Sequence, residues 1–134
     1  MDLRILEIAS NTENNKILAK HTHKSKNKNP MCGDVMEISL LVKDNKVVDM
    51  GYQCKSCVYC QASVSLLSQN IKDKNLEEIK DLIYNCEKQF ENTKIILERK
   101  WINFKEIFNK DNLSRKECLL LPMRTVLKAL NYND

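Results

Sequence analysis

The stretch that decides the fold runs from Val35 to Cys57 and reads VMEISLLVKDNKVVDMGYQCKSC. In its first half every second residue is apolar, at Met36, Ile38, Leu40 and Val42. In its second half the same alternation places apolar residues at Val48, Met50 and Tyr52. A period of two is typical of strands with one buried face, and Asp44-Asn45 is typical of a tight turn. The pattern therefore predicts a β-hairpin with one solvent-exposed face.

Downstream of Cys57 the apolar residues follow a helical period. The first predicted helix carries the stripe Cys60, Val64, Leu67 and Ile71. Asn75 and Glu78 form a capping pattern for a second helix, with the stripe Ile79, Leu82, Ile83, Cys86 and Phe90. A charged, helix-prone stretch then runs through Trp101 and Phe108. Ser114 to Glu117 forms another capping pattern for a last helix, with the stripe Leu119, Met123, Val126, Leu127 and Leu130.

Upstream of the hairpin, residues 3–9 have the apolar spacing of a short helix. Residues 11–31 are polar and rich in Asn and Lys, so we expect a loop there. The order of helix, hairpin and helices predicts an α+β fold, with helices packed on one face of a small antiparallel sheet. At 134 residues with 43% hydrophobic content, we expect the whole chain, 1–134, to form one domain.

The composition excludes several classes of protein. The net charge is only +4, and no basic stripe is interleaved with aromatic residues, so we expect no nucleic-acid partner. The longest uncharged run, Ser56 to Ile71, is too short and polar to span a bilayer. The first four residues lack the layout of a secretory signal, so we expect a cytoplasmic protein. In the reducing cytoplasm, six cysteines indicate metal or redox chemistry rather than disulfides.

One candidate site residue is Cys32, which lies in the turn-forming sequence Asn29-Pro30-Met31-Cys32-Gly33-Asp34. The carboxylate of Asp34 would raise the pKa of a lone thiol two residues away, which does not suit a reactive nucleophile. The pairing suits a cation held between a sulfur and an oxygen ligand. The alternative is a turn in which Asp34 accepts hydrogen bonds from backbone amides.

Two further cysteines, Cys57 and Cys118, lie where helices are predicted to begin. Unpaired amides and the helix dipole favour a thiolate at such positions. Pro122 lacks an N–H and so loosens the first turn around Cys118. Three thiols and a carboxylate, each at the end of an element, suffice for one tetrahedral metal site.

The remaining cysteines allow other interpretations. Cys86 lies on an apolar helix stripe, which favours a core residue over a ligand. The spacing of Cys54, Cys57 and Cys60 is weakly similar to the cysteine run of bacterial ferredoxins, which would make the protein an electron carrier. Cys60 continues an apolar stripe and is expected to be semi-buried, whereas Cys54 is a spare or redox-active thiol. A purely structural zinc site is a further alternative.

Three motifs together resemble the U-type iron–sulfur cluster scaffold family, which includes IscU, SufU and the N-terminal domain of NifU. They are Asn29-Pro30-Met31-Cys32-Gly33-Asp34-Val35-Met36, then Cys57-x4-Ala62-Ser63-x-Ser65, and finally Arg115-x2-Cys118. The resemblance covers nearly the whole chain in the right order. It implies a three-stranded antiparallel sheet with helices packed on it. The step from Cys57 to Cys118 is similar to that of the SufU-like branch.

The resemblance also implies a site and a function. Cys32, Asp34, Cys57 and Cys118 would ligate a transient two-iron, two-sulfur cluster, or a zinc ion. A cysteine desulfurase would deliver persulfide sulfur, with Cys118 as the acceptor, and apo-proteins would receive the cluster. The protein would be a scaffold more than a turnover enzyme, and a monomer or weak homo-oligomer. The alternative within the family is a zinc-dependent sulfur acceptor that activates the desulfurase.

The chain departs from the family pattern in three places. Ser56 stands where the family usually has Gly before the second cysteine, and Glu117 stands where a His or basic residue often precedes the third. The Leu-Pro-Pro-Val-Lys segment that IscU-like members present to a dedicated chaperone is missing. We therefore expect no hand-off through that chaperone.

Overall fold

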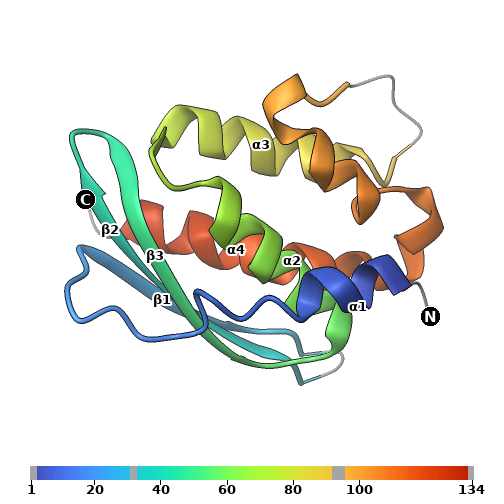
Figure 1. Ribbon diagram of the computed structural model, residues 1–134, viewed down its shortest axis with the longest axis horizontal. Coiled ribbons are helices and arrows are strands. Elements are labelled where there is room, and N and C mark those ends of the chain that lie inside the picture. Colours follow the sequence, from blue (N-terminus) through green and yellow to red (C-terminus); the bar gives the residue numbers. More distant parts are fainter. Residues whose placement is uncertain (1–2, 31–32, 92–95, 133–134) are drawn as a thin grey trace.

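The computed structural model describes residues 3–30, 33–91 and 96–132 (Figure 1). The elements, in chain order, are α1 (Leu3–Ala9), β1 (His23–Lys28), β2 (Val35–Lys43), β3 (Lys46–Lys55), α2 (Val58–Asn70), β4 (Lys74–Asn75), α3 (Leu76–Lys88), η1 (Arg99–Glu106), η2 (Lys110–Arg115) and α4 (Lys116–Tyr132). The two η elements are 3-10 helices. The predicted α+β class is confirmed: an antiparallel sheet lies against a layer of helices.

The sheet has four strands in the order β1-β2-β3-β4, so the prediction of three strands is wrong. Two strands form outside the predicted hairpin. β4 is a two-residue strand that pairs with the start of β3. β1 forms at residues 23–28, inside the stretch predicted to be a loop.

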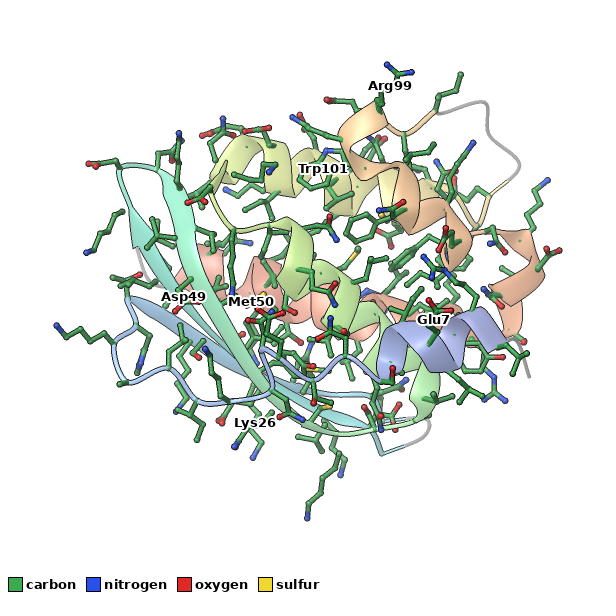
Figure 2. The ribbon with its side chains drawn as sticks, in the orientation of Figure 1. Glu7, Lys26, Asp49, Met50, Arg99 and Trp101 are labelled. Carbon is green, nitrogen blue, oxygen red and sulfur yellow. The ribbon has the colours of Figure 1, made fainter. Side chains whose placement is uncertain are left out.

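The polar strand β1 is held by its neighbours and not by an apolar face of its own. It pairs with β2 along its whole length, from His23 opposite Leu40 to Lys28 opposite Val35. The Ser25 hydroxyl donates to the Thr125 carbonyl at 2.6 Å, and Lys128 donates to the Lys26 carbonyl at 2.9 Å, so α4 secures this edge. The Lys26 side chain points away from the helices (Figure 2). Exposed lysines on an edge strand also oppose pairing with other chains.

The predicted hairpin between β2 and β3 is confirmed, and its turn has left-handed backbone at Asp44 (φ 52°) and Asn45 (φ 64°). Asn and Asp tolerate this conformation better than other residues with a side chain. The register shifts between Leu41 and Val42. Because a bulge reverses the alternation, Val47 is fully buried whereas Val48, predicted to be on the buried side, is only half-buried.

The face of the hairpin predicted to be exposed is in part covered by the chain itself. Residues 14–18 cross it in front of β3 (Figure 1), and Leu18 is buried there. Gly51 is required at this crossing, because a Cβ atom would meet the Lys16 carbonyl oxygen. Ser39 of β2, which lies opposite Gly51 in the sheet, is 4% exposed and accepts a hydrogen bond from the Leu18 amide.

The helices pack on the inner face of the sheet in two tiers. α2 and α4 contact each other and the sheet. α3 and η1 lie farther out, and Trp101 of η1 is buried in this outer tier (Figure 2). The predicted cap of α3 is confirmed, but α4 begins at Lys116 and Ser114 belongs to η2. The predicted helix-prone stretch through Trp101 forms the short helix η1. In the described part of the chain, no helix is long and apolar enough to cross a membrane.

Candidate metal centre

Three predicted ligands from three separate elements meet at one end of the sheet. Asp34 directly precedes β2, Cys57 is the residue at which α2 begins, and Cys118 lies in the first turn of α4. One ligand atom from each, a carboxylate oxygen or a Sγ, lies within 4.8 Å of the other two. No other group of three or more such side chains converges in this way within the described residues.

The spacing of these atoms suits a metal ion. Zinc–sulfur bonds are about 2.3 Å long, so two sulfur ligands of a tetrahedral ion lie about 3.8 Å apart. A separation within 4.8 Å needs only small adjustments to reach that value. Two soft thiols and one hard carboxylate are ligands for zinc or for iron in a cluster. The fourth predicted ligand, Cys32, lies outside the described residues.

Asp34 is held by a tight turn. The Asn29 amide donates to the Asp34 carbonyl and the Gly33 amide to the Asn29 carbonyl, both at 2.8 Å. Gly33 has a φ of +77°, a conformation that residues with a side chain rarely adopt. The turn brings Asp34 to the start of α2, where its Oδ1 accepts a hydrogen bond from the Cys57 amide at 3.3 Å.

The second carboxylate oxygen of Asp34 marks the site. The residue is only 7% exposed, yet its Oδ2 has no hydrogen-bond partner among the described residues. A buried carboxylate oxygen without a partner is costly, because it loses its hydration and gains nothing. A cation between Asp34, Cys57 and Cys118 would supply the missing interaction.

Cys57 and Cys118 are positioned by helix ends that are tied together. The Ser63 hydroxyl of α2 donates to the Leu119 carbonyl of α4 at 2.6 Å, which sets the depth of Cys118 beside α2. The Arg115 guanidinium lies 5.0 Å from the ring centre of Tyr59. Stacking of a cation on an aromatic ring is favourable, so this pair also joins the two helix starts.

The helix start at Cys57 is open to a ligand. Cys57 has extended backbone (φ −69°, ψ 166°) and its side chain makes no capping hydrogen bond. Pro122 lies one helical turn after Cys118 and has no N–H to donate to the Cys118 carbonyl. Of the three converging residues Cys57 is the most exposed, being half-buried where Asp34 and Cys118 are buried.

The other cysteines have distinct environments. Burial raises the pKa of the Cys54 thiol; the Ser56 hydroxyl lowers it, and the nearby charges of Asp34 and Cys57 raise it further. Cys60 is fully buried, more than the predicted semi-burial, and burial raises its pKa strongly. Cys86 is fully buried in the core, as predicted, and burial alone raises its pKa. These thiols are less available as thiolate ligands than an exposed cysteine would be.

The residues that meet here were predicted from the sequence, but those that place them were not. Neither Tyr59 nor the carbonyl of Leu119 was a candidate, because each acts through a partner more than fifty residues away. The only sequence signals for these contacts were the aromatic Tyr59 in the first turn of α2 and the small residues Ala62 and Ser63 that follow it. Neither signal names its partner without the tertiary structure.

The chain is similar in sequence to known proteins. Residues 2–93 match the family model described as the NifU-like N terminal domain. The chain is 34% identical over 104 residues to an iron–sulfur cluster assembly scaffold protein IscU of Thermotoga maritima, a match that covers 77% of this chain and 72% of that protein. It is 40% identical over 50 residues to IscU 1 of Archaeoglobus fulgidus, covering 37% of this chain and 33% of the relative. The match thus spans only a third of the Archaeoglobus protein's length.

Solved structures share the fold over nearly the whole chain. A NifU-like N-terminal protein from Brucella abortus has a TM-score of 0.87, with 97% of this chain and 91% of that one covered. A scaffold protein assigned to the SUF system of Fervidobacterium islandicum AW-1 has a TM-score of 0.89, with 97% and 96% covered. Both are 23% identical to this chain, so they establish the fold and not the chemistry.

Proposed function

The chain belongs to the family of NifU-like N-terminal domains, the U-type iron–sulfur cluster scaffolds, and on that premise we propose that it is a scaffold on which an iron–sulfur cluster is assembled. The observation that carries the proposal is the convergence of Asp34, Cys57 and Cys118 within 4.8 Å around a buried carboxylate oxygen without a partner. Cys32 is proposed as the fourth ligand. The cargo would be a transient two-iron, two-sulfur cluster.

Sulfur would arrive as a persulfide carried by a cysteine desulfurase. The Cys118 thiolate would attack the outer sulfur of that persulfide, so that a new sulfur–sulfur bond forms on Cys118 and the desulfurase recovers its thiol. This attack needs the thiolate form of Cys118, which a position at a helix start favours. Apo-proteins would receive the finished cluster.

Asp34 is proposed as the ligand that allows the cluster to leave. A carboxylate is a hard ligand and binds soft iron–sulfur centres less firmly than a thiolate does. We expect the Asp34→Ala protein to keep its cluster several-fold longer than the wild type when an apo-protein or a chelator is added. The decay of the cluster absorption measures this lifetime. Asp49→Ala, which removes a carboxylate outside the site, is the control, and faster loss from Asp34→Ala would contradict the role.

A second function uses the same ligands. Two thiols and a carboxylate of tetrahedral spacing also suit a zinc ion, which would hold the thiols as thiolates. The protein would then be a sulfur acceptor that stimulates the desulfurase and carries no cluster. Desulfurase turnover that does not respond to the added protein, or responds equally to Cys118→Ser, would exclude this function.

One experiment separates the two functions. The chain is purified without oxygen, and its iron, zinc and acid-labile sulfide are measured together with its visible spectrum. Iron with matching sulfide and a brown colour that is lost on transfer supports the scaffold. About one zinc per chain without colour, unchanged after incubation with iron and sulfide, supports the sulfur acceptor. A chain that holds neither zinc nor an iron–sulfur cluster, both as purified and after incubation with iron and sulfide, contradicts both functions.

A further inference from the structure

Cys57 has a second cysteine one helical turn away that the proposed ligand set does not use. Cys57 begins α2, and Cys60 is the third residue inside that helix. The sequence between them is Cys57-Val58-Tyr59-Cys60, a Cys-x-x-Cys spacing at a helix N-terminus. That placement is typical of dithiols that cycle between reduced and disulfide forms. The pair therefore needs an explanation apart from metal binding.

The backbone permits a disulfide within this pair. Two residues three apart in an α-helix have Cα atoms about 5 Å apart, inside the range of about 4.4–6.8 Å that disulfides span. Cys54 is also three residues from Cys57, but β3 runs through Lys55. Extended chain places residues three apart about 10 Å from one another, too far for a disulfide. The geometry thus selects Cys60 over Cys54 as the partner of Cys57.

The exposure of the two thiols sets their roles. Cys57 is half-buried and can be reached from outside, whereas Cys60 is fully buried. Within this pair Cys57 is therefore the residue that can receive sulfur from another group, and Cys60 can act only on what Cys57 holds. The buried Ser56 hydroxyl beside Cys57 has no hydrogen-bond partner among the described residues.

We propose that Cys57 and Cys60 form a dithiol that reduces sulfane sulfur at the site to sulfide. The inference rests on the proposed function, because it assumes that the site receives persulfide sulfur. In the first step the Cys57 thiolate takes the outer sulfur from a persulfide on Cys118, and Cys118 recovers its thiol. The Cys57 and Cys118 sulfurs lie within 4.8 Å, which is close enough for this exchange after a small movement.

In the second step the Cys60 thiol attacks the Cys57 sulfur of the persulfide. A Cys57–Cys60 disulfide forms, the bond to the outer sulfur breaks, and hydrogen sulfide leaves with the proton from Cys60. The two cysteine sulfurs supply the two electrons that the sulfane sulfur gains. A dithiol reductant then restores the pair for another turnover. Since Cys57 is also a proposed metal ligand, the reaction belongs to the metal-free chain.

The test follows a single turnover without any added reductant, so that the only other thiol is the one equivalent of glutathione that the transfer releases. The reduced, metal-free chain is mixed without oxygen with one equivalent of glutathione persulfide, the sulfide is trapped, and the cysteine peptides are analysed by mass spectrometry. We expect about one sulfide per wild-type chain and a Cys57–Cys60 disulfide, as the proposed reaction requires. Cys60→Ser should release at least tenfold less sulfide and keep its persulfide. Cys60→Ala serves if the serine variant does not fold.

Two matched variants control for the loss of a cysteine. Cys86→Ala removes another fully buried thiol, remote from the site, and Cys54→Ala removes the neighbouring thiol; both should release sulfide as the wild type does. Equal release from Cys60→Ser and wild type, or a disulfide elsewhere, would overturn the inference and leave the scaffold proposal intact. A chain that takes up no sulfane sulfur would overturn the inference together with the proposed sulfur receipt.

Discussion

The helices α2 and α3 have the same length of thirteen residues but begin in opposite ways. At α3, the Asn75 side chain accepts from the Glu78 amide at 2.8 Å, and the Glu78 carboxylate accepts from the Asn75 amide at 3.2 Å. At α2, Cys57 stands in the same position and its side chain caps nothing. The start of α3 is closed by its own cap, whereas at the start of α2 the Cys57 amide donates to Asp34 and the Cys57 thiol is not used as a cap.

The two helices also differ in how they are held. Eight residues of α2 are buried, against four of α3. Serines on α2 donate to carbonyls of other segments, as Ser65 does to Asn11 at 2.7 Å. The uncapped helix is therefore held by burial on several sides, whereas the capped helix keeps an exposed face. This difference suggests that a functional helix start is tolerated where packing replaces the cap.

Loss of packing in α2 should produce the largest effect. Leu67 is fully buried, and Leu67→Ala should lower the free energy of unfolding by about 2–5 kcal/mol, through lost burial and the cavity that remains. The corresponding change on the exposed face of α3, Tyr84→Ala, should alter the free energy of unfolding by about 0.5 kcal/mol or less. Urea unfolding followed by circular dichroism measures both. Similar losses in the two variants would contradict the contrast between the helices.

Converting the start of α2 to a structural cap should separate stability from binding. Ser is a preferred residue at this position and Cys is not, so Cys57→Ser should raise the free energy of unfolding by about 0.5–1 kcal/mol. The same change removes a thiolate ligand, and zinc affinity should fall by about a hundredfold or more. Competition with a chromogenic chelator measures the affinity. Zinc binding that survives the change would show that Cys57 is not a ligand.

The opposite experiment is made at the start of α3. Asn75→Ala removes a side-chain cap and should lower the free energy of unfolding by about 1 kcal/mol. Zinc affinity should not change, because Asn75 lies outside the converging residues. The same unfolding and competition assays apply. A fall in affinity with Asn75→Ala would mean that the site responds to general stability and not to its own ligands.

The smallest effect should be a pH dependence at the α3 cap. The Lys100 ammonium and the Asn75 amide hold the pKa of Glu78 below its ordinary value of 4.5. A carboxylate whose pKa is lower in the folded state adds stability above its unfolded pKa, and this contribution disappears as the pH falls through the folded value. The wild type should therefore exceed Glu78→Gln in stability at neutral pH and match it in strong acid. Glu13→Gln controls for loss of an exposed charge.

Local features of this fold were predictable from the sequence. The Asp44-Asn45 turn, the Asn75–Glu78 cap and the burial of Cys86 each depend on residues within one strand or one helical turn. The strand β1 was missed because its sequence, HKSKNK, carries no apolar alternation. It is a strand because β2 offers a free edge and because Thr125 and Lys128 of α4 hold it there.

The candidate site divides in the same way. The sequence by itself determined which residue types are available, namely a glycine turn before Asp34 and cysteines at two helix starts, because turns and helix ends are encoded by a few neighbouring residues. Only the tertiary structure decided that Asp34, Cys57 and Cys118 meet within 4.8 Å, and that Cys60 is buried behind Cys57. The first of these relations joins segments more than eighty residues apart, from Asp34 to Cys118. Both relations follow from how the helices pack on the sheet, which short sequence patterns do not specify.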